Sequence, residues 1–331
     1  MPRHTVGLIA ILVLGLLGLV LAAASPPKRV PTIGMLLSAP PPSGSEWKQR
    51  WEFLQELRTL GWREGENIAI EYRWAAGRSE RGAALAAELV GRHVDVIVVT
   101  FRPLIQAVQH ATTTIPIVML SVDDPVAEGF IASLAQPGGN ITGVDQSVIP
   151  ELSGKLLELL TGAVPTVRRI AILVDPRYAG TRQMVAETTR VAHAVSVQPH
   201  VLEVQNLAEL PRAFAAATQE GDGALLILPA LLFGLNERRL VSLAWEHRLP
   251  AIAWQRSFAE VGGLLAYGPN TAELWRRVAY YVDRILKGAK PADLPVERPS
   301  RFEFVINLKA AQALGLTIPP TLLFQADEVI R

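Results

Sequence analysis

The fold of this chain is decided by residues 115–144, IPIVMLSVDDPVAEGFIASLAQPGGNITGV. The apolar, β-branched run at 115–120 predicts a buried strand. A polar loop at 121–125 follows it, in which Asp124 and Pro125 suit the cap and the first turn of a helix. A strand, a loop with hydroxyl and carboxylate groups, and a helix start are typical of the ligand-facing edge of an open α/β sheet. For Asp124, a role as a helix cap alone is an equally good interpretation.

The alternation of strand and helix continues on both sides of this stretch. Before it we expect strands at 32–37, 67–74 and 94–100, and helices at 46–60, 81–92 and 103–112. After it we expect helices at 152–160, 182–194, 207–218, 237–247, 271–287 and 309–314, and strands at 169–174, 197–204, 223–228, 250–254, 263–267 and 302–307. Such alternation specifies parallel sheets covered by helices on both faces. Because the order occurs twice without a sequence period, we expect an α/β protein with two similar lobes rather than a repeat array.

Composition narrows the classes of function. The chain has 331 residues, 50% of them hydrophobic, which is ample for two domains. Lysine and arginine number 32 against 31 acidic residues, so no basic surface suggests nucleic acid as a partner. The sequence contains no cysteine, which excludes disulfides, thiolate metal sites and a cysteine nucleophile.

The N-terminus predicts export. Arg3 and His4 precede an apolar run at 6–21, and small residues follow at 22–25. This order is typical of a secretory signal peptide, which we place at residues 1–24. The alternative, a single membrane anchor, needs about 20 apolar residues, and this run is shorter. No lipid-accepting cysteine follows. Since residues 1–24 hold one arginine and no acidic residue, the rest of the chain would balance 31 bases against 31 acids.

Polar and aromatic residues gather where the expected strands end, which is the edge at which open α/β sheets bind ligands. They are Ser38, Ser43–Ser45, Thr100, Phe101, Arg102, Ser121–Asp124, Asp175–Tyr178, Pro229, Phe233, Trp254, Gln255 and Tyr267. Hydroxyls suit a carboxylate, an aspartate suits an ammonium group, and aromatic rings suit an apolar body. The set predicts a site for a small zwitterion or amphipathic molecule. Trp254 is also open to a simple packing role.

Signals for catalysis are weak. The six histidines lack metal-ligand spacing, and the sequence contains no G-x-S-x-G, P-loop or G-x-G-x-x-G motif. Asp123 and Asp124 are neighbours in a loop, and such side chains rarely point together as an acid/base pair. We therefore predict a protein that is not an enzyme, with no catalytic residues, no metal and no cofactor.

Several motifs, in order and spacing, resemble one family. They are LGWREGENIAIEYRWAAG (60–77), LAAELVGRHVDVIVV (85–99), the stretch at 112–144, AYGPN (266–270), RILKGAKPADLPVERPSRFEFVINLKAAQALGLTIPP (284–320) and ADEVIR (326–331). Together they resemble the ABC-transporter substrate-binding proteins of the tryptophan/tyrosine type, over nearly the whole chain from about residue 30.

The resemblance implies a type I periplasmic-binding-protein fold, in which two Rossmann-like lobes with parallel sheets close over one ligand. Three hinge segments would cross between the lobes near 144–147, 265–269 and 290–295. The N-terminal lobe would contain 30–145 and 268–290, and the C-terminal lobe 146–267 and 291–331. A ligand that bridges both lobes would stabilise the closed form, which a membrane permease would recognise.

The resemblance also implies which loops hold the solute. Ser38, Thr100, Ser121 and Asp123 would serve from the first lobe, and the second lobe or the crossing would add Asp175, Tyr178, Phe233, Trp254 and Tyr267. One departure concerns residues 100–103, TFRP, where relatives often carry a small, glycine-rich turn. Phe101 and Arg102 would fill space there and add a charge, so the ligand can differ from the family's aromatic amino acids. Arg102 suits a ligand carboxylate, and equally a solvated surface position.

The resulting hypothesis is a periplasmic, monomeric solute receptor of an ABC importer. Its solute would be an amino acid, aromatic or otherwise, or a small carboxylate, delivered to a membrane permease driven by its ATPase. The alternative is the ligand-sensing component of a signalling system with the same fold. A repressor core is disfavoured, because an export signal stands where a helix-turn-helix would be needed.

Overall fold

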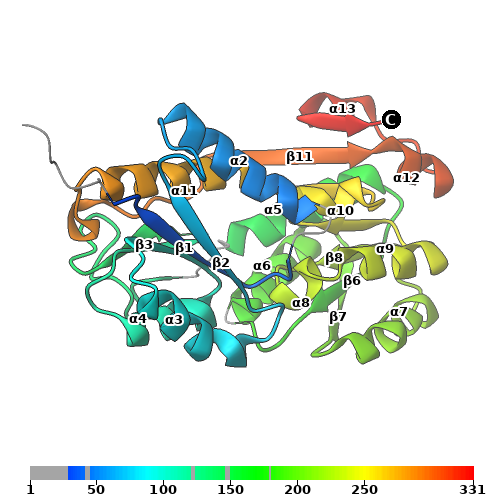
Figure 1. Cartoon of the computed structure of the whole chain (residues 1–331). Helices are drawn as coiled ribbons and strands as arrows, with labels where there is room; N and C mark the ends of the chain where they lie inside the picture. The colour runs from blue at the N-terminus through cyan, green and yellow to red at the C-terminus, as the bar shows by residue number, and fades with distance from the viewer. Residues whose placement is uncertain (1–28, 42–44, 121–123, 146–149, 179) are drawn as a thin grey trace, which may run out of the picture.

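The computed structural model describes residues 29–41, 45–120, 124–145, 150–178 and 180–331. Two β-sheets lie side by side, each with helices on both faces (Figure 1). The expected signal peptide lies outside the described residues and stays a prediction. None of the helices in the described part of the chain combines the length and the apolar character needed to cross a membrane.

The first sheet is parallel throughout, in the order β2-β1-β3-β4-β5. Its strands are β1 (Thr32–Leu37), β2 (Ala69–Trp74), β3 (Val96–Thr100), β4 (Ile117–Leu120) and β5 (Ile141–Val144). Its helices are α2 (Ser45–Thr59), the 3-10 turn η1 (Ser79–Arg81), α3 (Gly82–Gly91) and α4 (Arg102–Ala111). Every residue of β3 is buried, as its unbroken apolar sequence predicted.

The second sheet has the order β12-β11-β10-β9-β8-β6-β7 and is parallel except where β10 meets β11. Its strands are β6 (Arg169–Val174), β7 (Gln198–Glu203), β8 (Leu225–Ile227), β9 (Ala251–Ala253), β10 (Leu265–Pro269), β11 (Phe302–Asn307) and β12 (Glu328–Ile330). Its helices and turns are α5 (Pro150–Ala163), α6 (Thr181–Ala194), η2 (Leu207–Glu209), α7 (Leu210–Gln219), α8 (Leu231–Gly234), α9 (Glu237–Glu246), α10 (Arg256–Glu260), α12 (Leu308–Ala313) and α13 (Pro320–Gln325). The 3-10 turn η3 (Pro291–Asp293) lies against β5 of the first sheet.

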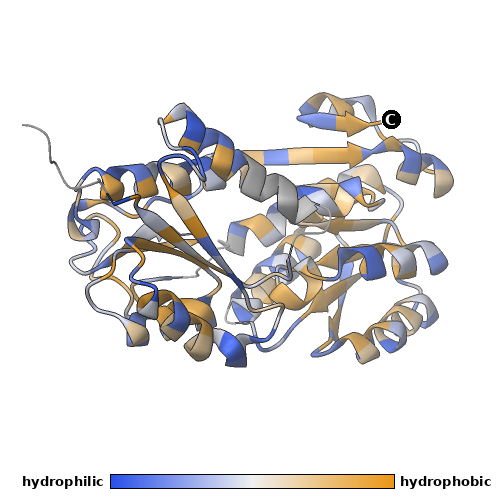
Figure 2. Ribbon diagram, viewed as in Figure 1, coloured by the Kyte–Doolittle hydropathy of each residue, from blue (hydrophilic) through white to orange (hydrophobic). Residues whose placement is uncertain are grey.

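Each sheet carries an apolar core on both faces. Figure 2 shows apolar residues along the strands of both sheets, with polar residues on the outward sides of the helices. One face of the first sheet packs against α3 and α4, and the other against α2 and α11 (Thr271–Leu286). In the second sheet, α5 and α6 cover one face while α7, α9 and α10 cover the other. Hydrophobic burial on four faces is therefore what holds the two sheets in their helical layers.

The chain runs between the two sheets three times. It leaves the first sheet after β5, returns after β10 into α11, and leaves again before β11. The third of these crossings, residues 297–301, hydrogen-bonds to the other two. The N–H of Asp145 donates to the carbonyl oxygen of Glu297 (2.8 Å), and the N–H of Asn270 donates to that of Arg301 (2.9 Å). The assignment of lobe boundaries to these crossings stays a prediction.

The structure corrects the helix expected after Asp124. The Asp124 carboxylate accepts the N–H of Ala127 (3.1 Å), as a cap would. The following residues form only one turn, because Gly129 adopts φ 71° and the chain then sends Phe130 into the core, where it is 4% exposed. Short elements that the sequence analysis did not anticipate are α8, α10, α13 and β12.

Gly143 is the residue of β5 at which the structure leaves no room for a side chain. It pairs with Met119 of β4 and has φ 138°, and a Cβ added to it would lie 2.1 Å from the carbonyl oxygen of Met119. Gly139, four residues earlier, has open space where a Cβ would stand. The two glycines form a matched pair for substitution.

We predict that Gly143→Ala lowers the free energy of unfolding by about 2 kcal/mol or more, through left-handed strain and a clash with rigid backbone. Gly139→Ala should stay within about 0.5 kcal/mol of the parent protein. Urea unfolding followed by circular dichroism measures both values. Equal losses in the two variants would contradict the assignment of this constraint to β5.

Candidate functional site

The carboxyl edge of the first sheet brings Ser38 and Thr100 together. They follow the neighbouring strands β1 and β3, and the N–H of Ser38 donates to the Thr100 hydroxyl oxygen (3.2 Å). The two hydroxyl oxygens lie 3.4 Å apart. The predicted residues after β4, Ser121 and Asp123, lie outside the described residues. The described part of this edge thus offers a pair of adjacent hydroxyls, and their predicted contact with a solute stays a prediction.

Phe101 and Arg102 follow Thr100 at the start of α4. Phe101 has φ 74°, a left-handed conformation that costs a bulky residue about 1–3 kcal/mol. Arg102 donates from Nη1 to the Glu128 carboxylate (2.8 Å). The Arg102 side chain is 42% exposed and paired with Glu128, and its predicted contact with a solute carboxylate stays a prediction.

Asp175 and Tyr178 follow β6 at the edge of the second sheet. The Asp175 side chain is buried and accepts two hydrogen bonds from the Arg177 guanidinium, at 2.9 and 2.7 Å. The hydrogen bond to Asp175 raises the pKa of Arg177 above its ordinary value. Tyr178 packs against the cores on both faces of the sheet, which places it at the edge between them. Asp175 therefore already has a cation as its partner.

Trp254 and Gln255 follow β9. Trp254 is half-buried beside α8: a Cβ added to Gly234 would lie 3.2 Å from its Cζ2 atom. The Oε1 atom of Gln255 is buried and has no hydrogen-bond partner in the part of the chain that the structure describes. A buried acceptor without a donor is costly, so Gln255 offers an unused polar contact at this edge.

Phe233 and Tyr267 occupy packing positions. Phe233 is completely buried in the core that α7, α9 and α10 cover. Tyr267 stacks on Phe302, with ring centroids 5.8 Å apart, and packs against the core beneath α5. Burial raises the pKa of the Tyr267 hydroxyl. In this state of the molecule Phe233 presents no surface to a solute, and the ligand contacts proposed for both residues stay predictions.

The two sheets approach each other close to these edges. A Cβ on Gly77, in the loop after β2, would lie 3.5 Å from Cδ1 of Leu235, just after α8. Figure 1 shows α8 near the carboxyl end of β2. Residues from the edges of both sheets are therefore within reach of one small molecule on this side of the protein.

A cavity of about 210 Å³ lies where the crossings meet. We call it the hinge cavity; it is lined by Val144, Asn270, Glu273, Leu274, Arg277 and residues 297–301. Val144 ends β5 and Asn270 directly follows β10, so the cavity stands at the carboxyl ends of strands from both sheets. This is where open α/β sheets bind ligands.

Charges surround the hinge cavity, and most of them are paired. Arg277 donates from Nη2 to the Glu297 carboxylate and lies over the ring of Tyr280, 4.2 Å from its centroid. Arg298 donates from Nε to the fully buried Asp145 carboxylate (3.1 Å). Burial alone would lower the pKa of Arg277, but the bond with Glu297 outweighs burial and raises it. These residues were not predicted from the sequence, because the predicted binding residues all lie where the expected strands end.

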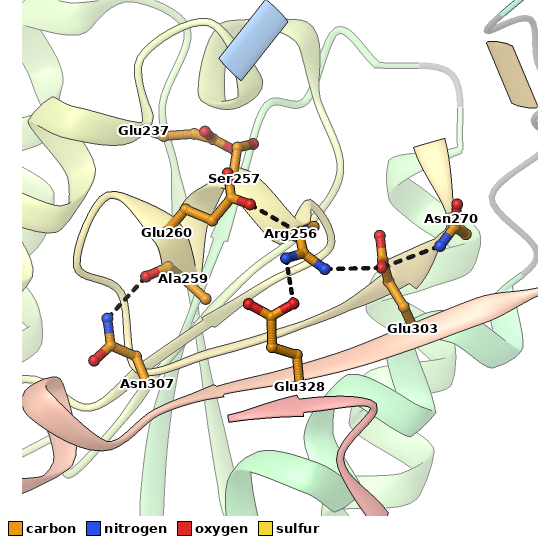
Figure 3. A network of polar contacts seen from close by, with 9 residues as sticks. All are labelled: Glu237, Arg256, Ser257, Ala259, Glu260, Asn270, Glu303, Asn307 and Glu328. Carbon is orange, nitrogen blue, oxygen red and sulfur yellow. Dashed lines mark hydrogen bonds and ion pairs between the residues drawn. The ribbon is translucent and has the colours of Figure 1, made fainter. Parts of the chain in front are cut away.

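A second polar network anchors the wall of the hinge cavity (Figure 3). Arg256 of α10 pairs with Glu260 (2.8 Å), with Glu303 of β11 (3.3 Å) and with Glu328 of β12. Burial raises the pKa of Glu303 despite its bond with Arg256. The Asn270 amide donates to Glu303 (3.1 Å) and its oxygen caps α11 by accepting the N–H of Glu273 (2.9 Å). One cation thus fixes the point at which β10 turns into α11.

The described side chains favour binding over catalysis. Among them, no group of three or more histidine and acidic residues is placed to hold a metal ion. What the two sheet edges and the hinge cavity do provide are hydroxyls, aromatic rings and charged groups, which can bind a small polar molecule through hydrogen bonds and ion pairs.

Comparison with known proteins gives a family match. A family model described as ABC transporter substrate binding protein matches residues 44–330. A tyrosine-binding protein of Clostridioides difficile is 25% identical over 270 residues, covering 81% of this chain and 77% of the relative.

Two solved structures resemble this one over 91% of its chain. An ABC domain from Streptococcus pneumoniae in complex with L-Trp has a TM-score of 0.80 and 26% identity, with 99% of that chain covered. A conserved domain protein from Vibrio cholerae also has a TM-score of 0.80, with 25% identity and 100% of that chain covered. The fold is that of type I periplasmic binding proteins, with two mostly parallel sheets, which confirms the expected fold class.

We predict that Arg256→Met lowers the free energy of unfolding by about 2 kcal/mol or more. The change removes the cation that pairs with the buried carboxylate of Glu303 and with the carboxylates of Glu260 and Glu328. Arg238→Met, at an exposed position on α9, should change it by less than about 0.5 kcal/mol. Urea denaturation of both variants checks this. A loss no larger than that of Arg238→Met would mean that the network does not stabilise this end of the sheet.

Proposed function

The chain belongs to the family of ABC transporter substrate-binding proteins, and we propose that it is the extracytoplasmic solute receptor of an ABC importer. The family and the tyrosine- and tryptophan-binding relatives are binding proteins, which confirms the expectation that the chain is not an enzyme. The observation that carries the proposal is the position of the hinge cavity, at the carboxyl ends of strands from both sheets and against the segments that connect them.

Aromatic amino acids are the solutes that this proposal favours. The relatives bind tyrosine and tryptophan according to their descriptions. In this chain Trp254 and Tyr178 stand at the edge of the second sheet and supply aromatic surface, while Ser38 and Thr100 supply hydroxyls from the first. An aromatic ring packed against Trp254 and a polar end near the hinge would use both kinds of contact.

Closure of the two lobes over a solute would produce the form that the transporter recognises. A solute that touches both sheets binds the closed form more tightly, so it shifts the population toward that form. The crossings are the segments that would bend. The lobes would divide near 145, near 268 and at 297–301 rather than at the predicted 290/291, because Leu294 accepts from Thr142 and Val296 donates to Leu134 in the first half of the chain. A membrane permease would then recognise the closed receptor and accept the solute, with its ATPase driving import.

The same proposal sets the location of the protein. Residues 1–24 would direct export, and the processed protein would act as a monomer in the periplasm. With 31 basic and 31 acidic residues after residue 24, the processed chain has no excess of positive charge that would attract it to anionic membranes.

We predict that L-tyrosine or L-tryptophan stabilises the purified protein in a thermal-shift screen of amino acids. A ligand at about 100 times its Kd adds roughly 2.7 kcal/mol to the free energy of unfolding. Failure of every amino acid and small carboxylate to raise the melting temperature would contradict the receptor proposal.

Trp254 provides a test of the site with a matched control. Trp254→Ala should weaken binding of the stabilising amino acid about tenfold or more in isothermal titration calorimetry, through loss of aromatic contact. Trp245 lies on α9, is 41% exposed and donates to the carbonyl oxygen of Gly262, so Trp245→Ala should leave Kd unchanged. An unchanged Kd for Trp254→Ala would remove Trp254 from the site.

A further inference from the structure

Two charged residues at the hinge cavity have no ion-pair partner among the described residues. They are Arg301, on the third crossing, and Glu273, in the first turn of α11. The nearest interaction of the Glu273 carboxylate is a long hydrogen bond from the Ser300 hydroxyl, at 3.4 Å. The other three charges beside the cavity, Arg277, Arg298 and Glu297, are all engaged in ion pairs. The cavity therefore has one unpaired charge of each sign in its wall.

Backbone contacts fix the segments that carry these two charges. Asn270 caps α11 through the N–H of Glu273 (2.9 Å), and the N–H of Asn270 donates to the carbonyl oxygen of Arg301 (2.9 Å). Asn270 is in turn held by Glu303 and the Arg256 network. Glu273 thus stands in the first turn of a capped helix, and the exposed Arg301 stands on a crossing whose backbone is held by a hydrogen bond, which lowers the ordering cost of binding.

Arg277 adds an unused donor to the same wall. Its Nε atom is buried and has no hydrogen-bond acceptor in the part of the chain that the structure describes. Buried donors of this kind are rare because they lose their bonds to water without replacement. A carboxylate in the cavity would supply an acceptor for Arg277 Nε and a counter-charge for Arg301.

Two arginines at the described sheet edges are already engaged: Arg102 is paired with Glu128 at 2.8 Å, and Arg177 is paired with Asp175 at 2.7 Å. A solute carboxylate that bound to either of these two would compete with its existing partner. Arg78, after β2, has no ion pair among the described residues but is exposed to solvent. At the hinge cavity a solute carboxylate would displace no partner.

We propose that the hinge cavity recognises the charged end of an α-amino acid, with Arg301 and the Nε of Arg277 binding its carboxylate and Glu273 binding its ammonium group. This inference rests on the proposed function and assigns its polar specificity to the hinge. Val144, Leu274 and Pro299 give the cavity an apolar wall for the carbon atoms between the two charges. Because these residues lie on the third crossing and on β5 and α11, the elements that the other two crossings join, the solute would bind beside the segments that bend.

The test compares charge-neutralising variants with analogues that lack one charge. The titrants are L-tyrosine and L-tryptophan, L-tyrosine amide without the carboxylate, and 3-(4-hydroxyphenyl)propionate without the ammonium group. The variants are Arg301→Gln and Glu273→Gln, and the control is Arg276→Gln, an exposed neighbour on α11 outside the cavity. Melting temperatures without ligand check that each variant folds; neither Arg301 nor Glu273 has an ion pair within the described residues to lose.

Each variant should lose affinity for solutes that carry the charge its residue binds, and keep its affinity for the analogue that lacks that charge. Arg301→Gln should weaken amino-acid binding about tenfold or more and should bind the amide as well as the parent protein does. Glu273→Gln should also weaken amino-acid binding about tenfold or more, and it should bind 3-(4-hydroxyphenyl)propionate as well as the parent protein does. Arg276→Gln should bind as the parent protein does.

Two other results would overturn the inference, and they can be told apart. Equal amino-acid affinity in Arg301→Gln, Glu273→Gln and Arg276→Gln would place the charged end of the solute elsewhere and leave the receptor function standing. No binding of any amino acid by the parent protein would overturn the receptor function and this inference together.

Discussion

The peptide groups of Glu297 hold the two halves of this protein in register. The Glu297 N–H donates to the carbonyl oxygen of Gly143 (3.2 Å), and the Glu297 carbonyl oxygen accepts the N–H of Asp145 (2.8 Å). The third crossing therefore pairs with the end of β5 as a short parallel strand would. Four residues later the carbonyl oxygen of Arg301 accepts the N–H of Asn270, which joins the same crossing to the second. The buried Asp145 carboxylate, paired with Arg298, adds a charge interaction that would be costly to break. The position of the hinge cavity follows from this pairing.

Three of the six described non-glycine residues with positive φ lie in loops at the carboxyl edge of the first sheet: Ala76, Phe101 and Asp124. Phe101 and Asp124 have φ values of 74° and 46°, and each directly adjoins a carboxyl-end loop of the first sheet. Bulky residues seldom occupy this conformation, and it persists only where the surrounding contacts enforce it. For Phe101 the enforcing contacts are its N–H bond to Leu120 and the pairing of Arg102 with Glu128. Phe101 thus directly follows Thr100, one of the two residues whose hydroxyls meet at this edge.

Sequence reasoning recovered most of the regular elements and placed Ser38 and Thr100 at strand ends. Strands such as β3 have an unbroken apolar sequence and helices such as α11 have strong periodicity, while the pairing of β1 with β3 explains why Ser38 meets Thr100. It failed where a single residue stops an element, as Gly129 does, and where partners lie apart in sequence, as Arg102 and Glu128 do. The hinge cavity could not be predicted because Val144, Glu273 and Arg301 are brought together only by the pairing of the crossings. No local pattern encodes that pairing.

The packing of α11 also constrains the order in which the chain can fold. This helix covers the face of the first sheet that β1, β3, β4 and β5 expose, and it lies beside α2, yet it follows β10 of the second sheet in sequence (Figure 1). Until residues 271–286 have been synthesised, Met35, Val98 and Val118 have only part of their apolar cover. The first half therefore cannot complete its core as an independent unit while the chain is growing, and its contacts close over a long loop. One apolar face of the first sheet therefore stays only partly covered until about residue 286 has been synthesised, although the opposite face can already pack against α3 and α4.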